Sequence, residues 1–219
     1  MNADDFIRDN SELLAPPLVP EIKLHLASEV IPLWRKTEEE LAAIGVPPPY
    51  WAFAWAGGQA LARYLLDHPE IVMGKRVLDF GAGSGLVALA AAKAGAAHVI
   101  AADIDFFAVA AIARNARAND LAVQAVVQDV IGSTESFDLI LVGDMCYERP
   151  LAERLMTWLN NARADVLLGD PGRSYFPKVG LTRLAIYSVP TTRELEDREI
   201  RETGVWRLNR DQDRGQNRG

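Results

Sequence analysis

A strand, a glycine-rich loop and a helix follow one another without interruption in the middle of the chain. Residues 76–80 (RVLDF) form a mostly apolar run with the composition of a buried strand. Gly81, Gly83 and Gly85 come next, and the alanine-rich residues 86–94 have the composition of a helix. Such a unit brings backbone N–H groups and a helix N-terminus to one point, where a ligand can approach closely. The sequence therefore predicts an α/β fold that holds a nucleotide-like ligand at this loop.

The alternation of strands and helices continues toward the C-terminal side. Apolar patterning predicts strands at 72–80, 98–103, 123–128, 137–143 and 165–169, and helices at 86–94, 106–119 and 150–161. This alternation predicts a parallel sheet with helices on both faces. Two further strands, at 181–189 and 200–208, are joined by a charged segment without an apolar helix, so they predict a C-terminal antiparallel hairpin.

The chain divides by composition into three parts: an N-terminal extension (1–46), the main domain (47–209) and a polar tail (210–219) that is predicted to be disordered. The remaining expected features are an irregular segment at 12–19, a short strand within 21–27, a helix from Thr37 that stops at Gly45, and a helix at 59–67.

Composition excludes several classes of protein. With 219 residues and a formal net charge of −7, the chain is long enough for one sizeable core and too acidic for non-specific nucleic-acid binding. It has no run of about 18 uncharged apolar residues, so no membrane span is expected. Cys146 is the single cysteine, which is typical of a reducing compartment. The acidic residues 1–14 resemble neither a secretory signal nor a transit peptide, so we expect a cytoplasmic location.

The glycine loop excludes two common ligands. A phosphate-binding P-loop requires a lysine after its last glycine, and residues 81–88 (GAGSGLVA) contain none. The dinucleotide pattern Gly-x-Gly-x-x-Gly fails because Leu86 stands at its third position. Asp79 lies at the end of the preceding strand, where a carboxylate would repel a pyrophosphate. This acid suits a ligand with a positive charge, such as the ammonium and sulfonium of S-adenosylmethionine.

Three further acids end predicted strands. Asp103 lies eighteen residues after Gly85, close to the spacing of about 20 residues expected for a ribose-diol acceptor. Asp129 is placed to accept from an adenine amino group, and Asp144 follows the next strand. A single acid of this kind is as readily explained by capping of the next helix. Together with Asp79, they predict one crevice at the carboxyl edge of the sheet, where open α/β sheets bind ligands.

The chain resembles the seven-β-strand methyltransferases that use S-adenosylmethionine, and among them the protein-lysine methyltransferases with an Asp-x-x-Tyr motif. That motif is here Asp144-Met145-Cys146-Tyr147. The resemblance extends to YWAFAWAGGQALARYLL (50–66) and GDPGRSYFP (169–177), which are most similar to the enzymes that act on the β-subunit of electron-transfer flavoprotein. It implies a Rossmann-like, seven-stranded class I methyltransferase sheet, S-adenosylmethionine as cofactor and that β-subunit as protein substrate.

The resemblance and the residue chemistry together predict the roles of individual side chains. Asp144 and Tyr147 are the expected catalytic residues: Asp144 orients the lysine amine and Tyr147 lines the substrate channel. Trp55 is expected to contact the cofactor, alternatively to pack in the core with Trp51. The predicted cofactor-binding residues are Trp55, Asp79, Gly81, Gly83, Gly85, Asp103 and Asp129. Cys146 is expected to be a small apolar filler, and the three histidines show no metal-ligand spacing.

Several functions stay open at this stage. The segment 99–120 is similar to ribosomal-protein methyltransferases, which typically carry an Asn-Pro-Pro-like motif or a related one where this chain has DMCY. A ribosomal protein is therefore a possible substrate. A small-molecule N-methyltransferase acting on a nicotinamide-like amine and a cofactor-binding pseudoenzyme are further alternatives. Arg173 is expected to contact the substrate backbone or an acidic patch, or else to be an arginine of a surface loop.

Overall fold

The computed structural model describes residues 2–27, 45, 47–191 and 200–209. Its helices are α1 (Ala3–Asp9), α3 (Ala56–Asp67), α4 (Leu86–Lys93), α5 (Phe106–Ala118) and α6 (Arg149–Asn161), with short 3-10 helices η2 (Tyr50–Ala52) and η3 (Pro69–Ile71). Its strands are β1 (Glu12–Leu14), β2 (Leu24–Leu26), β3 (Arg76–Phe80), β4 (His98–Asp103), β5 (Gln124–Val127), β6 (Leu139–Gly143), β7 (Asp165–Asp170), β8 (Leu181–Pro190) and β9 (Ile200–Leu208).

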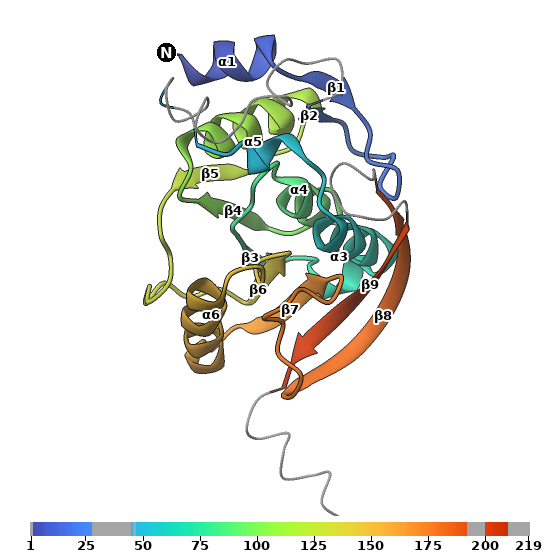
Figure 1. Cartoon of the computed structure of the whole chain (residues 1–219), viewed down its shortest axis with the longest axis vertical. Coiled ribbons are helices and arrows are strands. Elements are labelled where there is room, and N and C mark those ends of the chain that lie inside the picture. Colours follow the sequence, from blue (N-terminus) through green and yellow to red (C-terminus); the bar gives the residue numbers. More distant parts are fainter. Residues whose placement is uncertain (1, 28–44, 46, 192–199, 210–219) are drawn as a thin grey trace, which may run out of the picture.

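A seven-stranded mixed sheet forms the centre of the molecule (Figure 1). Its strand order is β5-β4-β3-β6-β7-β9-β8. Strands β3 to β7 run parallel, and β9 pairs antiparallel with both β7 and β8. The order reverses between β3 and β6, which places a crevice at their carboxyl ends. The predicted class I methyltransferase sheet with a C-terminal antiparallel hairpin is confirmed.

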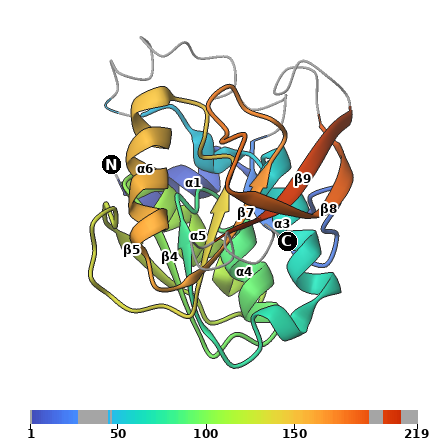
Figure 2. The same cartoon turned by 90° about the horizontal axis from the view of Figure 1, so that it is seen from below.

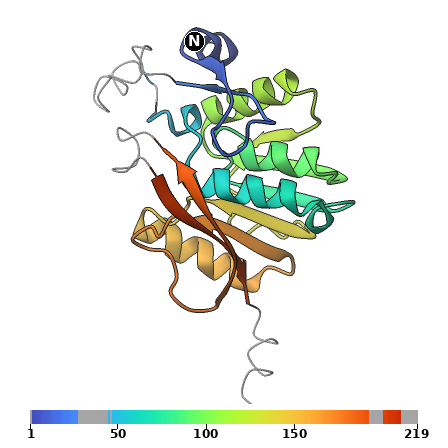
Figure 3. The same ribbon diagram turned by 90° about the vertical axis from the view of Figure 1, so that its right-hand side faces the viewer.

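Apolar residues alternate between two cores on the two faces of the sheet. Val77 of β3 packs in the core that includes residues of α3, α4 and α5, whereas its neighbour Leu78 packs with Leu155 and Leu159 of α6. Figure 2 and Figure 3 show α6 on the opposite side of the sheet from α3 and α4. Parallel strands need such cover on both faces, since their backbones are buried. None of the described helices is long and apolar enough to cross a membrane.

The described part of the N-terminal extension packs on α5. Ile7 of α1 shares a small core with Trp51, Ala108 and Ala111. Asp4 forms ion pairs with two arginines of α5, Arg114 and Arg117. These contacts attach the extension to the same face of the sheet as α5.

Two features of the extension differ from the expectation. Helix α1 was not predicted, and the segment 12–19 expected to be irregular begins with the exposed strand β1, which pairs antiparallel with β2. Both elements are short, so tertiary contacts determine them rather than a local pattern: α1 packs on α5, and the exposed strand β1 pairs with β2. The helix expected from Thr37 and the tail at 210–219 lie outside the described residues.

The N-terminal end of α3 touches β6 and β7 through glycine. A Cβ built on Gly57 would overlap the Gly169 carbonyl oxygen, and one on Gly169 would overlap the Gly57 carbonyl oxygen. A Cβ built on Gly143 would lie 3.1 Å from the Gly58 Cα, a less severe contact. The helix can approach the sheet this closely only because these positions have no side chain.

We therefore expect Gly57→Ala to lower the free energy of unfolding by about 1–3 kcal/mol, the usual cost of overpacking. Gly58→Ala is the matched control, because its Cβ would meet only Val87 Cγ2, at 3.9 Å. That variant is expected to stay within about 1 kcal/mol of wild type. Urea denaturation of both variants measures the difference. Equal losses would show that the contact with Gly169 does not limit the position of α3.

Candidate active site

The glycine loop between β3 and α4 has an unusual backbone. Gly81, Gly83 and Gly85 have φ angles of 61°, 51° and 79°, in the left-handed region that glycine adopts without strain. Gly85 is the N-cap of α4. The Gly83 N–H donates to Asp103 Oδ2 at 2.9 Å, and Asn115 Nδ2 donates to the Ser84 carbonyl at 2.8 Å. The loop is thus held from β4 and α5 in a fixed shape.

Asp79 is a buried carboxylic acid at the end of β3. Its Oδ2 accepts from the Ala88 N–H of α4 at 2.9 Å, and its side chain is 2% exposed. Desolvation raises the pKa of the Asp79 carboxyl to about 8, and the negative charge of Asp103 adds to this, against the lowering effect of the Ala88 hydrogen bond. None of these contacts supplies a positive charge. Ionised Asp79 would favour a cation in the crevice.

A narrow crevice lies between the glycine loop and the start of α3. Its volume is about 40 Å³, and its lining residues are Phe53, Trp55, Gly58, Asp79, Gly81, Ala82, Gly83, Ser84, Leu86, Val87 and Gly143. Trp55 is the N-cap of α3, and its Nε1 donates to the Tyr50 carbonyl at 2.9 Å. Met145 lies directly over Gly81. A nucleoside would need more room than this.

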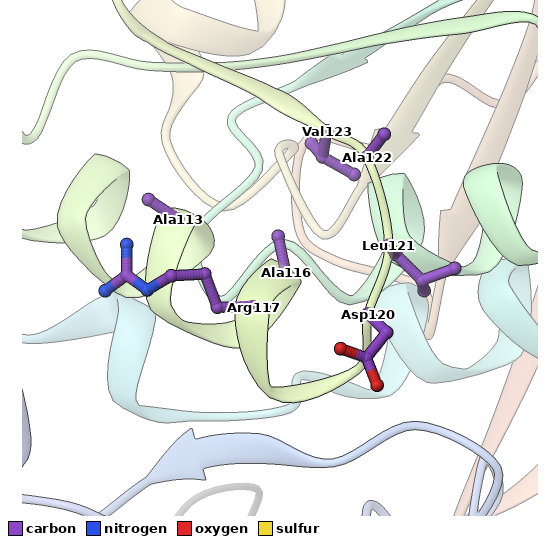
Figure 4. A pocket seen from close by; sticks show the side chains of 7 residues that line it. All are labelled: Ala113, Ala116, Arg117, Asp120, Leu121, Ala122 and Val123. Carbon is purple, nitrogen blue, oxygen red and sulfur yellow. The ribbon is translucent and has the colours of Figure 1, made fainter.

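A larger hollow lies at the other edge of the sheet. Its volume is about 630 Å³, and Figure 4 shows its lining residues Ala113, Ala116, Arg117, Asp120, Leu121, Ala122 and Val123. These residues belong to the end of α5 and the connection to β5, on the amino side of that strand. It shares no lining residue with the crevice, and its acid and base are surface residues. The volume of a hollow therefore does not identify the functional site in this protein.

Asp144 follows β6 and lies under the start of α3. Its φ angle is 58°, a left-handed conformation that Asp and Asn tolerate better than other residues. The Gly58 N–H donates to Asp144 Oδ2 at 3.1 Å. Arg173 donates to Asp144 Oδ1 from Nε at 3.0 Å and from Nη2 at 2.7 Å. Both carboxylate oxygens are engaged, in a position where the side chain is only 8% exposed.

The remaining residues of the motif differ in exposure. The Tyr147 side chain is partly exposed, and its ring centroid lies 6.0 Å from that of Tyr50. Cys146 is buried, and desolvation together with the charges of Asp170 and Asp144 raises the pKa of its thiol to about 12. A thiol in this state is not ionised near neutral pH, which agrees with the expected role as a small filler.

The other predicted acids lie outside the crevice lining. Asp103 contacts the glycine loop through Gly83 and also accepts from the Asp105 N–H at 2.9 Å. Asp129 is exposed and pairs with Arg154 of α6 at 3.0 Å. Its role toward adenine stays a prediction. In the described ranges, no group of three His, Cys, Asp or Glu side chains is arranged to hold a metal ion.

The structure adds Asp170, which the sequence analysis did not single out. Its Oδ1 accepts from the N–H groups of Gly172 and Arg173, both at 2.7 Å. Desolvation raises the pKa of the Asp170 carboxyl to about 7. The sequence feature that could have indicated Asp170 is GDPGR at the end of a predicted strand, because an acid followed by Pro and Gly favours a tight turn. Arg173 stands at the end of that turn, beside Asp144.

Known proteins share sequence with this chain along most of its length. A family model described as ribosomal protein L11 methyltransferase (PrmA) matches residues 60–145. The chain is 42% identical over 216 residues to the electron transfer flavoprotein beta subunit lysine methyltransferase of Danio rerio, covering 94% of this chain and 83% of the relative. The corresponding Xenopus laevis protein is 40% identical over 211 residues, covering 92% and 85%.

A solved structure shows the same fold at low identity. The magnesium protoporphyrin IX methyltransferase of Synechocystis PCC 6803 with bound SAM has a TM-score of 0.53 and 17% identity, covering 69% of this chain and 79% of that one. This similarity supports the class I methyltransferase fold.

Asp79 makes stability depend on pH in a predictable direction. Between about pH 4 and 8, folded Asp79 holds a proton that the unfolded chain has released, so stability falls as pH rises. Asp79→Asn removes this effect and keeps an acceptor for the Ala88 N–H. Relative to wild type, we expect the variant to gain on the order of a few kcal/mol between pH 5 and pH 8.

Urea midpoints of both proteins at the two pH values measure this difference. A loss of stability that the Asn side chain causes equally at both pH values does not affect it. Asp129→Asn is the control, because its exposed carboxyl has a lowered pKa and is ionised throughout this range. An Asp79→Asn variant whose stability depends on pH as wild type does would show that Asp79 is ionised in the folded protein.

Proposed function

The chain belongs to the electron transfer flavoprotein β-subunit lysine methyltransferases, and from this membership we propose that its substrate is the β-subunit of electron transfer flavoprotein. It is an S-adenosylmethionine-dependent protein-lysine N-methyltransferase. The observation that carries the assignment is similarity along nearly the whole chain, 42% identity over 94% of it. The Asp144–Tyr147 motif lies at the carboxyl edge of the sheet, next to the glycine loop.

The match to ribosomal protein L11 methyltransferases supports a narrower conclusion. It begins within α3 and ends at Met145, so it covers the glycine loop and the strand-end acids but stops before Tyr147. The matched part is the cofactor half of the fold. The substrate side, with GDPGRSYFP and the β8–β9 hairpin, lies outside it. We therefore favour electron transfer flavoprotein over a ribosomal protein as the substrate.

The glycine loop and the charge of the crevice suit S-adenosylmethionine. A Cβ built on Gly83 would meet nothing closer than 4.0 Å, so the loop backbone is open to a ligand on that side. Asp79 lacks a positive partner in the contacts that set its pKa, and the cofactor carries positive charge. The residues that would hold the cofactor are Trp55, Asp79, Gly81, Gly83, Gly85, Asp103 and Asp129. When bound, it supplies a methyl group on a sulfonium, which a neutral amine can attack.

The side chains at the end of β6 act on the lysine. A lysine with a pKa of about 10.4 is almost wholly protonated at pH 7, and removing its proton costs about 4–5 kcal/mol. Asp144 accepts an N–H of the amine and so directs its lone pair, and it stabilises the positive charge that grows on nitrogen. Tyr147, partly exposed beside Tyr50, lines the approach of the lysine chain. Orienting the amine toward the methyl group in this way supplies much of the rate enhancement.

Methyl transfer to purified electron transfer flavoprotein tests the substrate. With labelled S-adenosylmethionine we expect label in the β-subunit, and lysine-to-arginine changes at the labelled positions should abolish it. Free nicotinamide and ribosomal protein L11, assayed in parallel, should take up at most a few per cent of that label. Preferential labelling of either one would replace the proposed substrate.

Asp103→Ala tests the proposed cofactor site. The variant removes the predicted ribose acceptor and the hydrogen bond that holds Gly83, so affinity for S-adenosylmethionine should fall about 10-fold to 100-fold. Isothermal titration calorimetry measures this, with circular dichroism to verify folding. Asp105→Ala is the control, since the Asp105 side chain caps α5 through the Phe107 N–H. Unchanged affinity in folded Asp103→Ala would remove Asp103 from the cofactor site.

A further inference from the structure

The Asp144–Arg173 ion pair connects the two segments that are proposed to meet the substrate. Arg173 Nη2 lies 2.7 Å from Asp144 Oδ1, and the two side chains are 18% and 8% exposed. The guanidinium also lies 5.8 Å from the centroid of the Trp55 ring. One arginine therefore touches the acid assigned to the lysine and a residue that lines the crevice.

The turn after β7 holds Arg173 in this position. Asp144 and Asp170 follow neighbouring parallel strands, and the Asp144 N–H donates to the Gly169 carbonyl at 3.0 Å. Asp170 Oδ1 accepts from two N–H groups of the turn, those of Gly172 and Arg173. Gly172 has a φ angle of 90°, which lets the chain reverse toward Asp144. Asp170 Oδ2 is buried and has no hydrogen-bond partner in the described part of the chain.

This pairing resolves a conflict in the chemistry of Asp144. A lone carboxylate beside a lysine favours the ammonium form, which has no lone pair and cannot attack a methyl group. A carboxylate that already carries a guanidinium has its charge compensated, yet its oxygens keep lone pairs that can accept an N–H. Such a group can orient a neutral amine without holding it protonated.

We propose that Arg173 is a positioning residue that compensates the charge of Asp144 and fixes its orientation, so that Asp144 receives the substrate lysine as a neutral amine. Asp170 sets this arrangement by folding the turn that carries Arg173. The proposal rests on the proposed function, because it takes Asp144 as the residue that meets the lysine. It concerns neither cofactor binding nor the choice of protein substrate.

The rate as a function of pH distinguishes this role from a structural one. Without the guanidinium, Asp144 raises the pKa of the bound lysine, so the rising limb of kcat should move to higher pH. For Arg173→Met we expect kcat to fall about 10-fold to 100-fold at pH 7 and much less at pH 9.5. The other ionisable groups on the elements around Asp144 are Tyr50, Cys146, Tyr147 and Asp170, and all four are present in both wild type and Arg173→Met.

The same Arg173 substitution made in a protein that lacks the Asp144 carboxylate tests whether Arg173 acts through Asp144. Asn tolerates the left-handed backbone at this position, so Asp144→Asn is the suitable change. In Asp144→Asn, adding Arg173→Met should change kcat less than 3-fold and should not move the pH profile, since no carboxylate remains to be compensated. Arg76→Met is the matched control, because Arg76 lies at the amino end of β3, where it pairs with Glu135 and lies over the Phe137 ring. It should leave both the rate and its pH dependence unchanged.

Substitutions of Asp170 test independently whether the turn positions Arg173. Asp170→Asn keeps an oxygen for the two turn N–H groups and should retain nearly full kcat, whereas Asp170→Ala should show the rate and pH profile of Arg173→Met. Calorimetry should give S-adenosylmethionine affinities within 2-fold of wild type for all of these variants, and thermal denaturation should show them folded.

Three results would overturn the proposal. One is a loss in Arg173→Met that is equal at all pH values. Another is a loss that multiplies with that of Asp144→Asn, which would give Arg173 its own contact with substrate. The third is a lower KM with unchanged kcat, which would make Arg173 a competitor of the substrate lysine.

A wild-type protein that labels a different protein acceptor refutes only the proposed substrate, and the same comparison is then made with that acceptor. Absence of methyl transfer to any protein in a lysate would refute both.

Discussion

The close packing of α3 against β6 and β7 determines the geometry on which the site depends. The glycine backbones of Gly57 and Gly169 meet without side chains between them, and this brings the Gly58 N–H to Asp144. The same approach places Trp55, the N-cap of α3, at the rim of the crevice. One backbone contact therefore positions groups on both the cofactor and the substrate side. A methyl group at Gly57 would separate them, because backbone atoms cannot rotate away as a side chain does.

Much of this arrangement follows from local sequence signals. The predicted bounds of β4 and β9 agree with the structure, because β-branched residues mark both strands in the sequence. The strand-end position of Asp79, Asp103 and Asp144 follows from the parallel alternation, which directs carboxyl ends to one edge. The sequence does not tell these acids apart. Their states depend on what each meets in space: the Ala88 N–H for Asp79, the glycine loop for Asp103 and a guanidinium for Asp144.

The features that the sequence does not predict depend on contacts between residues far apart in the chain. Helix α1 has a weak local pattern and is held through Ile7 and the pairing of Asp4 with arginines of α5, which lie about a hundred residues away in the chain. The contact of Arg173 with Asp144 depends on the turn that Asp170 and Gly172 form. A charged residue in a polar loop gives no sign of the direction in which it points. For that reason the sequence left Arg173 undecided between substrate and solvent.

Asp79 and Asp144, two of the buried acids of the site, differ in how their charge is compensated, and under the proposed function this difference assigns the cofactor to Asp79 and the substrate lysine to Asp144. Asp79 has a strongly raised pKa and gains from a ligand that brings positive charge. Asp144 already carries the guanidinium of Arg173, so a second cation beside it meets repulsion as well as attraction. A positively charged cofactor is thus favoured at one carboxyl, and a neutral nucleophile is favoured at the other. Methyl transfer requires this combination, because the sulfonium must be bound as a cation and the lysine must attack through a free lone pair.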